Sequence, residues 1–132
     1  RNLGLSNKKL NELPDLSKYT NLEILDCYNN NLTSLNNLPT TLKKLNCSHN
    51  NITNLDNLPP NLKELYSYDN KLTNLDNLPQ LLKTLYCDTN NLTNLDNLPI
   101  NLKILYCNNN PLIYNFIPTL ENIKNYNSNL KN

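Results

Sequence analysis

The sequence contains no Ala, Val, Met or Trp, and it has a single Phe and a single Gly, Gly4. Nucleotide-binding loops of the Rossmann and P-loop kinds need several glycines clustered where a strand meets a helix, so one glycine excludes them. No apolar run approaches the roughly 18 residues needed to cross a bilayer. No charged segment followed by an apolar one opens the chain, so the sequence predicts neither a membrane span nor a signal peptide.

The chain also lacks an excess of charge of either sign, because 12 basic side chains are balanced by 11 acidic ones. Nucleic-acid-binding surfaces usually show a clear basic excess, so we expect no nucleic-acid partner. The cysteines lack the paired CxxC spacing of a zinc site, and we expect no metal and no other cofactor. A catalytic serine or cysteine needs an adjacent base. His49 is the only histidine and stands at a variable surface position, so the sequence predicts a protein without enzymatic activity.

Leu and Asn dominate what is present, with 30 leucines and 32 asparagines among 132 residues. They recur in units of 20 residues, and a fixed internal period of this length is typical of solenoids. Five clear units begin at residues 21, 41, 61, 81 and 101, and we number the positions within each unit from 1 to 20. In all five, Leu occupies positions 2 and 5 and Asn occupies position 10. Positions 15, 18 and 19 are Leu, Leu and Pro in the first four of these units. We expect a single domain of about seven turns over residues 1–132, with units at 1–20, 21–40, 41–60, 61–80, 81–100, 101–118 and 119–132.

The spacing within one unit predicts a short strand followed by an extended return. Positions 5 and 7 alternate with positions 4, 6 and 8, which is the period of a strand whose odd positions face inward. One unit cannot bury its leucines alone, so stacked units must share a core. Twenty residues leave too little chain for a full helix, and Pro at position 19 prevents a helix from running through the second half. The predicted fold class is therefore a repeat solenoid with a parallel sheet along one side.

The pattern LxxLxCxxNxL, followed by a second leucine-rich half that ends in LP, resembles the leucine-rich repeat family. The 20-residue length resembles the short bacterial-type subclass known from secreted effectors and surface proteins. This resemblance implies a right-handed solenoid bent into an arc, with the strands on its concave face and extended or 3₁₀ segments on its convex side. The sequence departs from that subclass at position 16, where such effectors often carry Pro and this chain carries Asn36, Asp56, Asp76 and Asp96.

Two inward-facing rows have a structural interpretation. Position 10 follows the strand, where backbone groups lose their ladder partners and a carboxamide can supply both donors and an acceptor. This structural row comprises Asn30, Asn50, Asn70, Asn90 and Asn110. Position 7 holds the four cysteines, which are Cys27, Cys47, Cys87 and Cys107. We expect them to be buried free thiols that pack as small apolar residues rather than disulfides, which is compatible with a reducing compartment.

The outward-facing positions 4, 6, 8 and 9 hold the candidate binding residues. Tyrosines fall in two neighbouring rows, and Tyr is enriched in protein interfaces. The face is mildly acidic, which favours a partner with a basic patch. A second interpretation stays open, because tyrosines stacked on adjacent strands can serve only to stabilise the sheet. The candidate residues are Tyr28, Lys44, His49, Glu64, Tyr66, Tyr68, Asp69, Tyr86, Asp88 and Tyr106.

The sequence favours a non-enzymatic module that binds a protein partner on its concave strand face, with no membrane partner. Two alternatives stay open: the recognition part of a larger effector, such as the ubiquitin-ligase effectors whose repeats these resemble, or a cell-surface adhesion protein. We expect a cytoplasmic location, including the cytoplasm of a host cell, with a secreted or surface location as the alternative. No cap precedes Leu3 and Leu5, so a homodimer through the N-terminal edge of the sheet is a further option.

Overall fold

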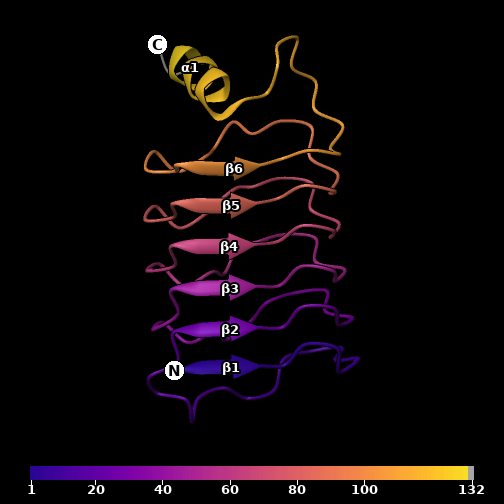
Figure 1. Ribbon diagram of the computed structural model, residues 1–132, viewed down its shortest axis with the longest axis vertical. Helices are drawn as coiled ribbons and strands as arrows, with labels where there is room; N and C mark the ends of the chain where they lie inside the picture. Colours follow the sequence, from indigo (N-terminus) through magenta and orange to yellow (C-terminus); the bar gives the residue numbers. More distant parts are fainter. Residues whose placement is uncertain (131–132) are drawn as a thin grey trace.

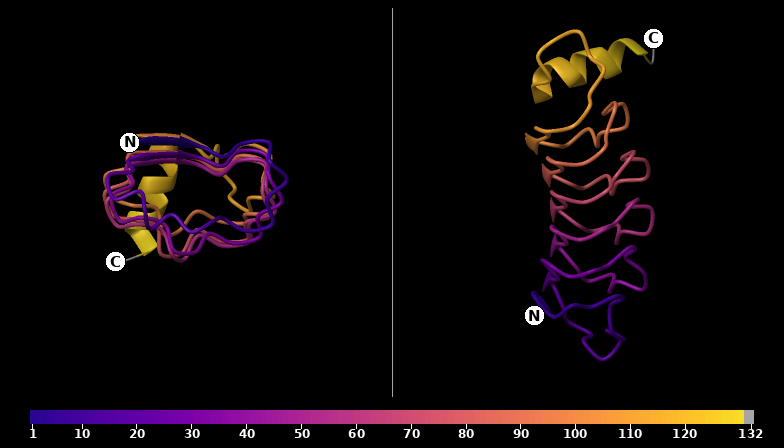
Figure 2. Two further views of the ribbon diagram at one scale, coloured as in Figure 1. Left: turned by 90° about the horizontal axis from the view of Figure 1, so that it is seen from below. Right: turned by 90° about the vertical axis from the view of Figure 1, so that its right-hand side faces the viewer.

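The computed structural model describes residues 1–130, which form one parallel six-stranded sheet and one helix. The strands lie in the sheet in chain order, and each pairs in register with the next. Figure 1 shows them stacked like rungs, and the coils nearly superimpose when viewed along the stack in Figure 2. The strands are β1 (Asn2–Gly4), β2 (Ile24–Asp26), β3 (Lys44–Asn46), β4 (Glu64–Tyr66), β5 (Thr84–Tyr86) and β6 (Ile104–Tyr106).

Rows of leucine fill the interior of the coil. The central residue of each strand points inward, and in β2 to β5 this leucine is 0% exposed: Leu25, Leu45, Leu65 and Leu85. The equivalent Leu105 in β6 is only partly buried, because no further strand stacks beyond it. Burying one leucine contributes about 1.5–3 kcal/mol, and each coil depends on its neighbours for that burial. The predicted fold class, a solenoid of parallel strands, is confirmed.

The return half of each coil is extended and built of turns, with no 3₁₀ helix in the part of the chain that the structure describes. Proline at position 19 has no N–H to donate, but its carbonyl accepts a hydrogen bond from the N–H of position 2 in the following unit. These bonds measure 3.2 Å from Leu42 to Pro39 and 3.3 Å from Leu62 to Pro59. They close the turn that returns the chain to the next strand.

A residue in the left-handed conformation follows each of the strands β2 to β6. The residues at position 9 have φ between 55° and 59°, a conformation that Asn and Asp adopt more readily than other non-glycine residues. The row comprises Asn29, His49, Asp69, Thr89 and Asn109. Thr89 fits this conformation least well, because its β-branched side chain is crowded there. This row was not predicted from the sequence.

The expectation of a seventh turn over residues 119–132 was wrong. Leu120–Leu130 form the helix α1 instead, and residues 131–132 lie outside the described residues. The Thr119 hydroxyl oxygen accepts a hydrogen bond from the N–H of Asn122 at 3.1 Å, which is a typical helix N-cap. Ile123 is 0% exposed, and Figure 1 shows the helix covering the end of the stack beyond β6. α1 is neither long enough nor apolar enough to cross a membrane.

Candidate interaction surface

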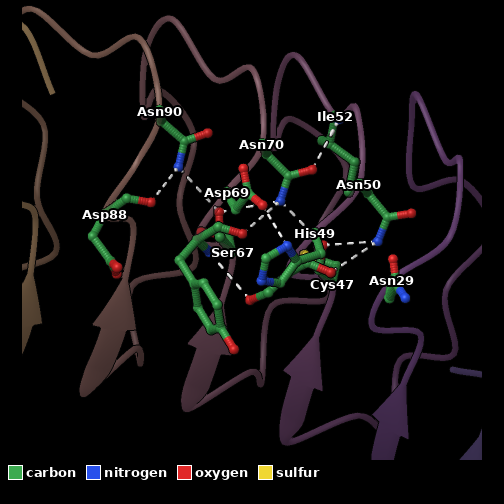
Figure 3. Close-up of polar contacts among 12 residues, drawn as sticks. Asn29, Cys47, His49, Asn50, Ile52, Ser67, Asp69, Asn70, Asp88 and Asn90 are labelled. Carbon is green, nitrogen blue, oxygen red and sulfur yellow. Dashed lines mark hydrogen bonds and ion pairs between the residues drawn. The ribbon is translucent and has the colours of Figure 1, made fainter. Parts of the chain in front are cut away.

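An asparagine ladder fixes the backbone where each strand ends. Asn70 Nδ2 donates to the carbonyl oxygens of Cys47 at 3.1 Å and Ser67 at 3.2 Å. Its Oδ1 accepts a hydrogen bond from the N–H of Ile52 at 3.0 Å, and Figure 3 shows this side chain between those of the neighbouring coils. The side chain therefore joins two coils. The same contacts recur along the row of Asn30, Asn50, Asn70, Asn90 and Asn110.

In each of the coils of β2 to β5, the carbonyl oxygen of the residue at position 7 accepts hydrogen bonds from two ladder asparagines. The Cys47 carbonyl oxygen, for example, lies 3.0 Å from Asn50 Nδ2 and 3.1 Å from Asn70 Nδ2. Because consecutive asparagines share an acceptor, the strand ends are fixed relative to one another.

The four cysteines are free and buried, as predicted. Burial raises the pKa of the Cys27 thiol to about 12, and it holds the pKa of Cys47 and Cys87 well above the ordinary thiol range. A thiol that stays protonated is a poor nucleophile. Ser67 takes the same position in the coil of β4, and its hydroxyl donates to the Tyr86 carbonyl oxygen at 3.0 Å. The residues at this position therefore contribute to packing.

One row of tyrosines forms a continuous ladder of rings over β4, β5 and β6. The ring centroids of Tyr66 and Tyr86 lie 4.7 Å apart, and those of Tyr86 and Tyr106 lie 4.4 Å apart. The Tyr66 hydroxyl donates to Glu64 at 3.1 Å, and the pKa of Tyr66 is raised by burial and by this hydrogen bond. Tyr106, on the last strand, is 48% exposed. The ladder thus changes from a half-buried stack to an accessible ring at its C-terminal end.

A second aromatic group forms beside the ends of the strands. His49 lies between two tyrosines, with its ring centroid 4.9 Å from Tyr28 and 5.4 Å from Tyr68, and both contacts are edge-to-face. His49 Nδ1 also pairs with the Asp69 carboxylate. The repeat register predicts a surface position for His49 but does not predict this cluster. The left-handed turn at position 9 brings the imidazole over the neighbouring tyrosine row, and repeated Asn and Asp at that position could have indicated the turn.

Most acidic groups of the face already have partners. Asp26 accepts a hydrogen bond from the Tyr28 N–H at 3.0 Å, and Glu64 and Asp69 are engaged as described above. Asp88 differs, because its Oδ1 is buried and has no hydrogen-bond partner among residues 1–130. No group of three or more His, Cys, Asp or Glu side chains in that same range could hold a metal ion.

One buried residue that positions this face was not predicted. Ser48 is 0% exposed, and its hydroxyl oxygen accepts a hydrogen bond from the Tyr68 N–H at 3.2 Å. The bond joins the ends of two neighbouring strands and fixes the backbone at Tyr68, which is one of the two tyrosines that contact His49. No sequence signal indicates it, because the other residues at position 8 are larger and are partly or fully exposed.

Comparison with known proteins supports the class that the geometry defines, a solenoid of stacked parallel strands joined by a polar ladder. No protein-family model matches the chain, and a search of curated proteins finds no match. Among solved structures, it is similar to a Shigella effector LRR domain, with 36% identity, a TM-score of 0.79, and coverage of 91% of this chain and 53% of that one. A further match is YopM from Yersinia enterocolitica WA-314, with 30% identity, a TM-score of 0.47, and coverage of 84% and 34%.

This chain is a leucine-rich repeat protein of the bacterial type. It spans about half the length of the Shigella domain that it matches. That similarity supports a protein-interaction module built from leucine-rich repeats.

Proposed function

We propose that the chain is a non-enzymatic module that binds a protein partner on its strand face. The observation that carries this proposal is the pair of tyrosine groups on one rigid face, the ladder of Tyr66, Tyr86 and Tyr106 and the cluster around His49. Tyr supplies a large contact area at low entropic cost and is frequent among interface hot spots. The proposed contact residues are Tyr28, Lys44, His49, Glu64, Tyr66, Tyr68, Asp69, Tyr86, Asp88 and Tyr106.

The proposal competes with a purely structural role for the tyrosines. Stacked rings stabilise neighbouring strands, and the short centroid distances are consistent with that role. Exposure favours an additional binding role, since Tyr106 and the adjacent Ile104 are 48% and 46% exposed. An apolar pair that only stabilised the sheet would gain from deeper burial.

The state of the cysteines, of two serines at the strand ends and of His49 supports a module that carries out no chemistry. The buried cysteines have raised pKa values, and Ser48 and Ser67 are 0% exposed. His49 is occupied by its contact with the Asp69 carboxylate and by two tyrosine rings. A general base must be free to reach a substrate proton, and these contacts disfavour that role for His49.

We further propose that the chain acts as the recognition part of a larger effector, in the cytoplasm of a host cell. The similarity to a Shigella effector LRR domain, at 36% identity over 91% of this chain, supports this proposal. The sequence that flanks these residues in the complete gene tests it. A catalytic domain next to the repeats would support the proposal, whereas a signal peptide with a surface anchor would favour an adhesion protein.

The binding proposal is tested by affinity capture from host-cell lysate with paired variants. Tyr66→Ala together with Tyr86→Ala removes the centre of the ladder, while Thr53→Ala with Thr73→Ala changes two exposed residues of the return half as a control. Tyr66→Phe with Tyr86→Phe keeps the stacked rings and removes only the hydroxyl groups. It therefore shows whether a loss of capture comes from a destabilised sheet or from a lost contact with the partner. We expect the alanine pair to lose a protein that the threonine control retains. Full retention by a folded alanine pair would remove the strand face from consideration.

A further inference from the structure

A row of lysines stands where the strands begin. Position 3 is Lys in the four coils of β3 to β6, and all four of these residues are exposed: Lys43, Lys63, Lys83 and Lys103. Their backbones are stacked directly, because the N–H of each of the last three donates to the carbonyl oxygen of the lysine before it at 2.9 Å. Neighbouring strands lie about 4.8 Å apart, so the row places four like charges on roughly 15 Å of the stack. Such charges repel one another, and an anion beside the row would relieve the repulsion.

Among residues 1–130, only the N-terminal end of the row has a counter-charge in contact with it. Lys43 Nζ lies 3.3 Å from the Glu23 carboxylate, and Arg1 pairs with the same carboxylate. The other three lysines of the row form no ion pair within those residues. Their ammonium groups are therefore open to an anion from outside the chain.

Two further acidic side chains lie near this edge of the sheet. Glu64 is the register partner of Lys44 on β3, and its carboxylate accepts a hydrogen bond from the Tyr66 hydroxyl at 3.1 Å, so it is engaged on the side of the tyrosine ladder. Glu121 of α1 and Lys103 line one hollow at the C-terminal end of the row, and no ion pair among the described residues joins them. The lysines at position 3 in the coils of β4 and β5 are therefore left without a carboxylate of their own.

A shallow hollow with an apolar wall opens beside the row. It measures about 440 Å³, and Lys43, Lys63 and Leu81 are among the residues that line it. Leu81 is 44% exposed, whereas Asn or Thr takes this position in the other four clear units. Glu23 lines the same hollow, but Lys43 and Arg1 hold its carboxylate. The hollow thus offers an unpaired ammonium group and an apolar contact side by side.

We propose that the lysine row is a second contact surface, at the start of the strands, and that it binds an extended acidic segment of a protein. Two carboxylates of the segment pair with Lys63 and Lys83, and an apolar side chain on the same side of the segment contacts Leu81. In an extended chain every second side chain points the same way, about 7 Å apart, and the flexible stems of lysine reach carboxylates at that spacing.

The charge and the apolar wall favour a peptide over other polyanions. Nucleic acids and anionic membranes are bound by surfaces with a broad basic excess, and this chain has a net charge of only +1. A short row of lysines beside an exposed leucine is complementary to a segment that carries both acidic and apolar side chains. The surface lies outside the tyrosine ladder at position 6, so it extends the proposed function rather than restating it.

The test titrates the isotope-labelled chain with a capped peptide in which glutamates and one leucine alternate with serine, followed by NMR. One comparison peptide has glutamine in place of glutamate, and a second has serine in place of leucine. We expect the acidic peptide to shift the amide signals of Lys63, Lys83 and their neighbours. The glutamine peptide should bind at least about fivefold more weakly, and the peptide without leucine about threefold more weakly.

Paired variants show whether the row itself is the site. Lys63→Gln with Lys83→Gln should weaken binding of the acidic peptide about fivefold. Lys8→Gln with Lys9→Gln, which removes the same charge from two exposed lysines of the first coil, is the matched control and should keep the affinity within about twofold. The glutamine peptide is measured on the unchanged chain, so that comparison does not depend on the stability of any variant.

Several results would overturn the lysine site. They are equal binding of the glutamine peptide, an equal loss of affinity in the two lysine pairs, and shifts confined to the tyrosine ladder. A further contrary result is that the row binds phosphatidylserine vesicles or a single-stranded oligonucleotide while the acidic peptide fails to bind. Capture through the tyrosine ladder is tested separately by the alanine pair at Tyr66 and Tyr86, so that function stands or fails independently of the lysine row.

Discussion

Replacing Asn70 with Leu tests whether the asparagine ladder holds the coils together. Asn70 is 8% exposed, so the substitution acts in the interior. The Ile52 N–H loses the Asn70 Oδ1 that accepts its hydrogen bond, and it has no other acceptor among the described residues. The carbonyls of Cys47 and Ser67 are affected less, because each keeps a hydrogen bond from a second ladder asparagine.

The size of the effect follows from this inventory. One buried N–H without a partner costs about 1–3 kcal/mol, and the two lost donor contacts cost about 1 kcal/mol each. The added apolar surface of leucine recovers part of this. We therefore expect Asn70→Leu to lower the free energy of unfolding by about 3 kcal/mol. For a chain of this size, that loss corresponds to a melting temperature lower by roughly 10 °C.

The assay is thermal and urea unfolding followed by far-UV circular dichroism, with Asn74→Leu as the control. Asn74 lies in the same unit but is exposed, and its Oδ1 accepts a single local hydrogen bond from the Asp76 N–H at 3.1 Å. The control should therefore lose no more than about 1 kcal/mol. The reasoning about shared ladder contacts is refuted if Asn70→Leu melts no lower than Asn74→Leu.

The buried thiols and the left-handed turns support three other predictions. Between pH 9 and 12 the thiols ionise in the unfolded chain, whereas Cys27 stays largely protonated in the fold. The free energy of unfolding should therefore fall as the pH rises, and Cys27 alone should account for a loss of about 4 kcal/mol by pH 12. Urea midpoints measured across that range check this, and Cys27→Ser, which copies the residue that Ser67 places in the coil of β4, should reduce the slope. A disulfide reagent should modify the native cysteines slowly and the urea-unfolded ones at once; rapid modification of all four in native protein contradicts burial. Thr89→Asn should raise stability by about 1 kcal/mol and Asn109→Thr should lower it, and equal melting of both variants and the parent would contradict the strain at position 9.

The repeat itself could be predicted from the sequence because its spacing reports geometry directly. Alternation at positions 4 to 8 located the strands, and the leucines at position 5 proved to be fully buried in β2 to β5. The rows at positions 7 and 10 were predicted as buried because a residue type repeated every 20 residues must meet the same surroundings each time. The tyrosine rows followed from the same register, whereas their use in binding stays a prediction.

The C-terminal segment could not be predicted in this way, because its apolar spacing fits two structures. Leu120 and Ile123 are three residues apart, a spacing shared by the repeat and by one face of a helix. The deciding signals were local: Pro118 and then Thr119 precede a segment that lacks the LP pair of the return half. A polar contact also holds α1 against the last coil, since Lys124 Nζ donates to the Leu102 carbonyl oxygen at 2.7 Å. Such long-range contacts leave no mark in the spacing.

The contacts of His49 could not be predicted for a different reason. They depend on a left-handed turn that Asn29, Asp69 and Asn109 indicate in their own coils. His and Thr at the same position weaken that signal, and His49 itself stands in the coil that lacks it. Once the turn is known, the placement of His49 beside Tyr28 and Tyr68 follows from the stacking of coils. The burial of the Asp88 Oδ1 could not be predicted either, because it depends on packing and not on residue type. The aspartates at position 16 of the same repeats are exposed or only partly buried.

Site-specific photo-crosslinking tests the central claim, binding of a protein partner on the strand face, most directly. A photoreactive phenylalanine analogue replaces Tyr106 in one preparation and Asn74, on the return half, in another, and both are irradiated in host-cell lysate. We predict that position 106 forms a covalent adduct with the protein that the unmodified chain captures. Position 74 should form no adduct with that protein. An adduct with that protein from position 74 and none from position 106 would contradict the claim.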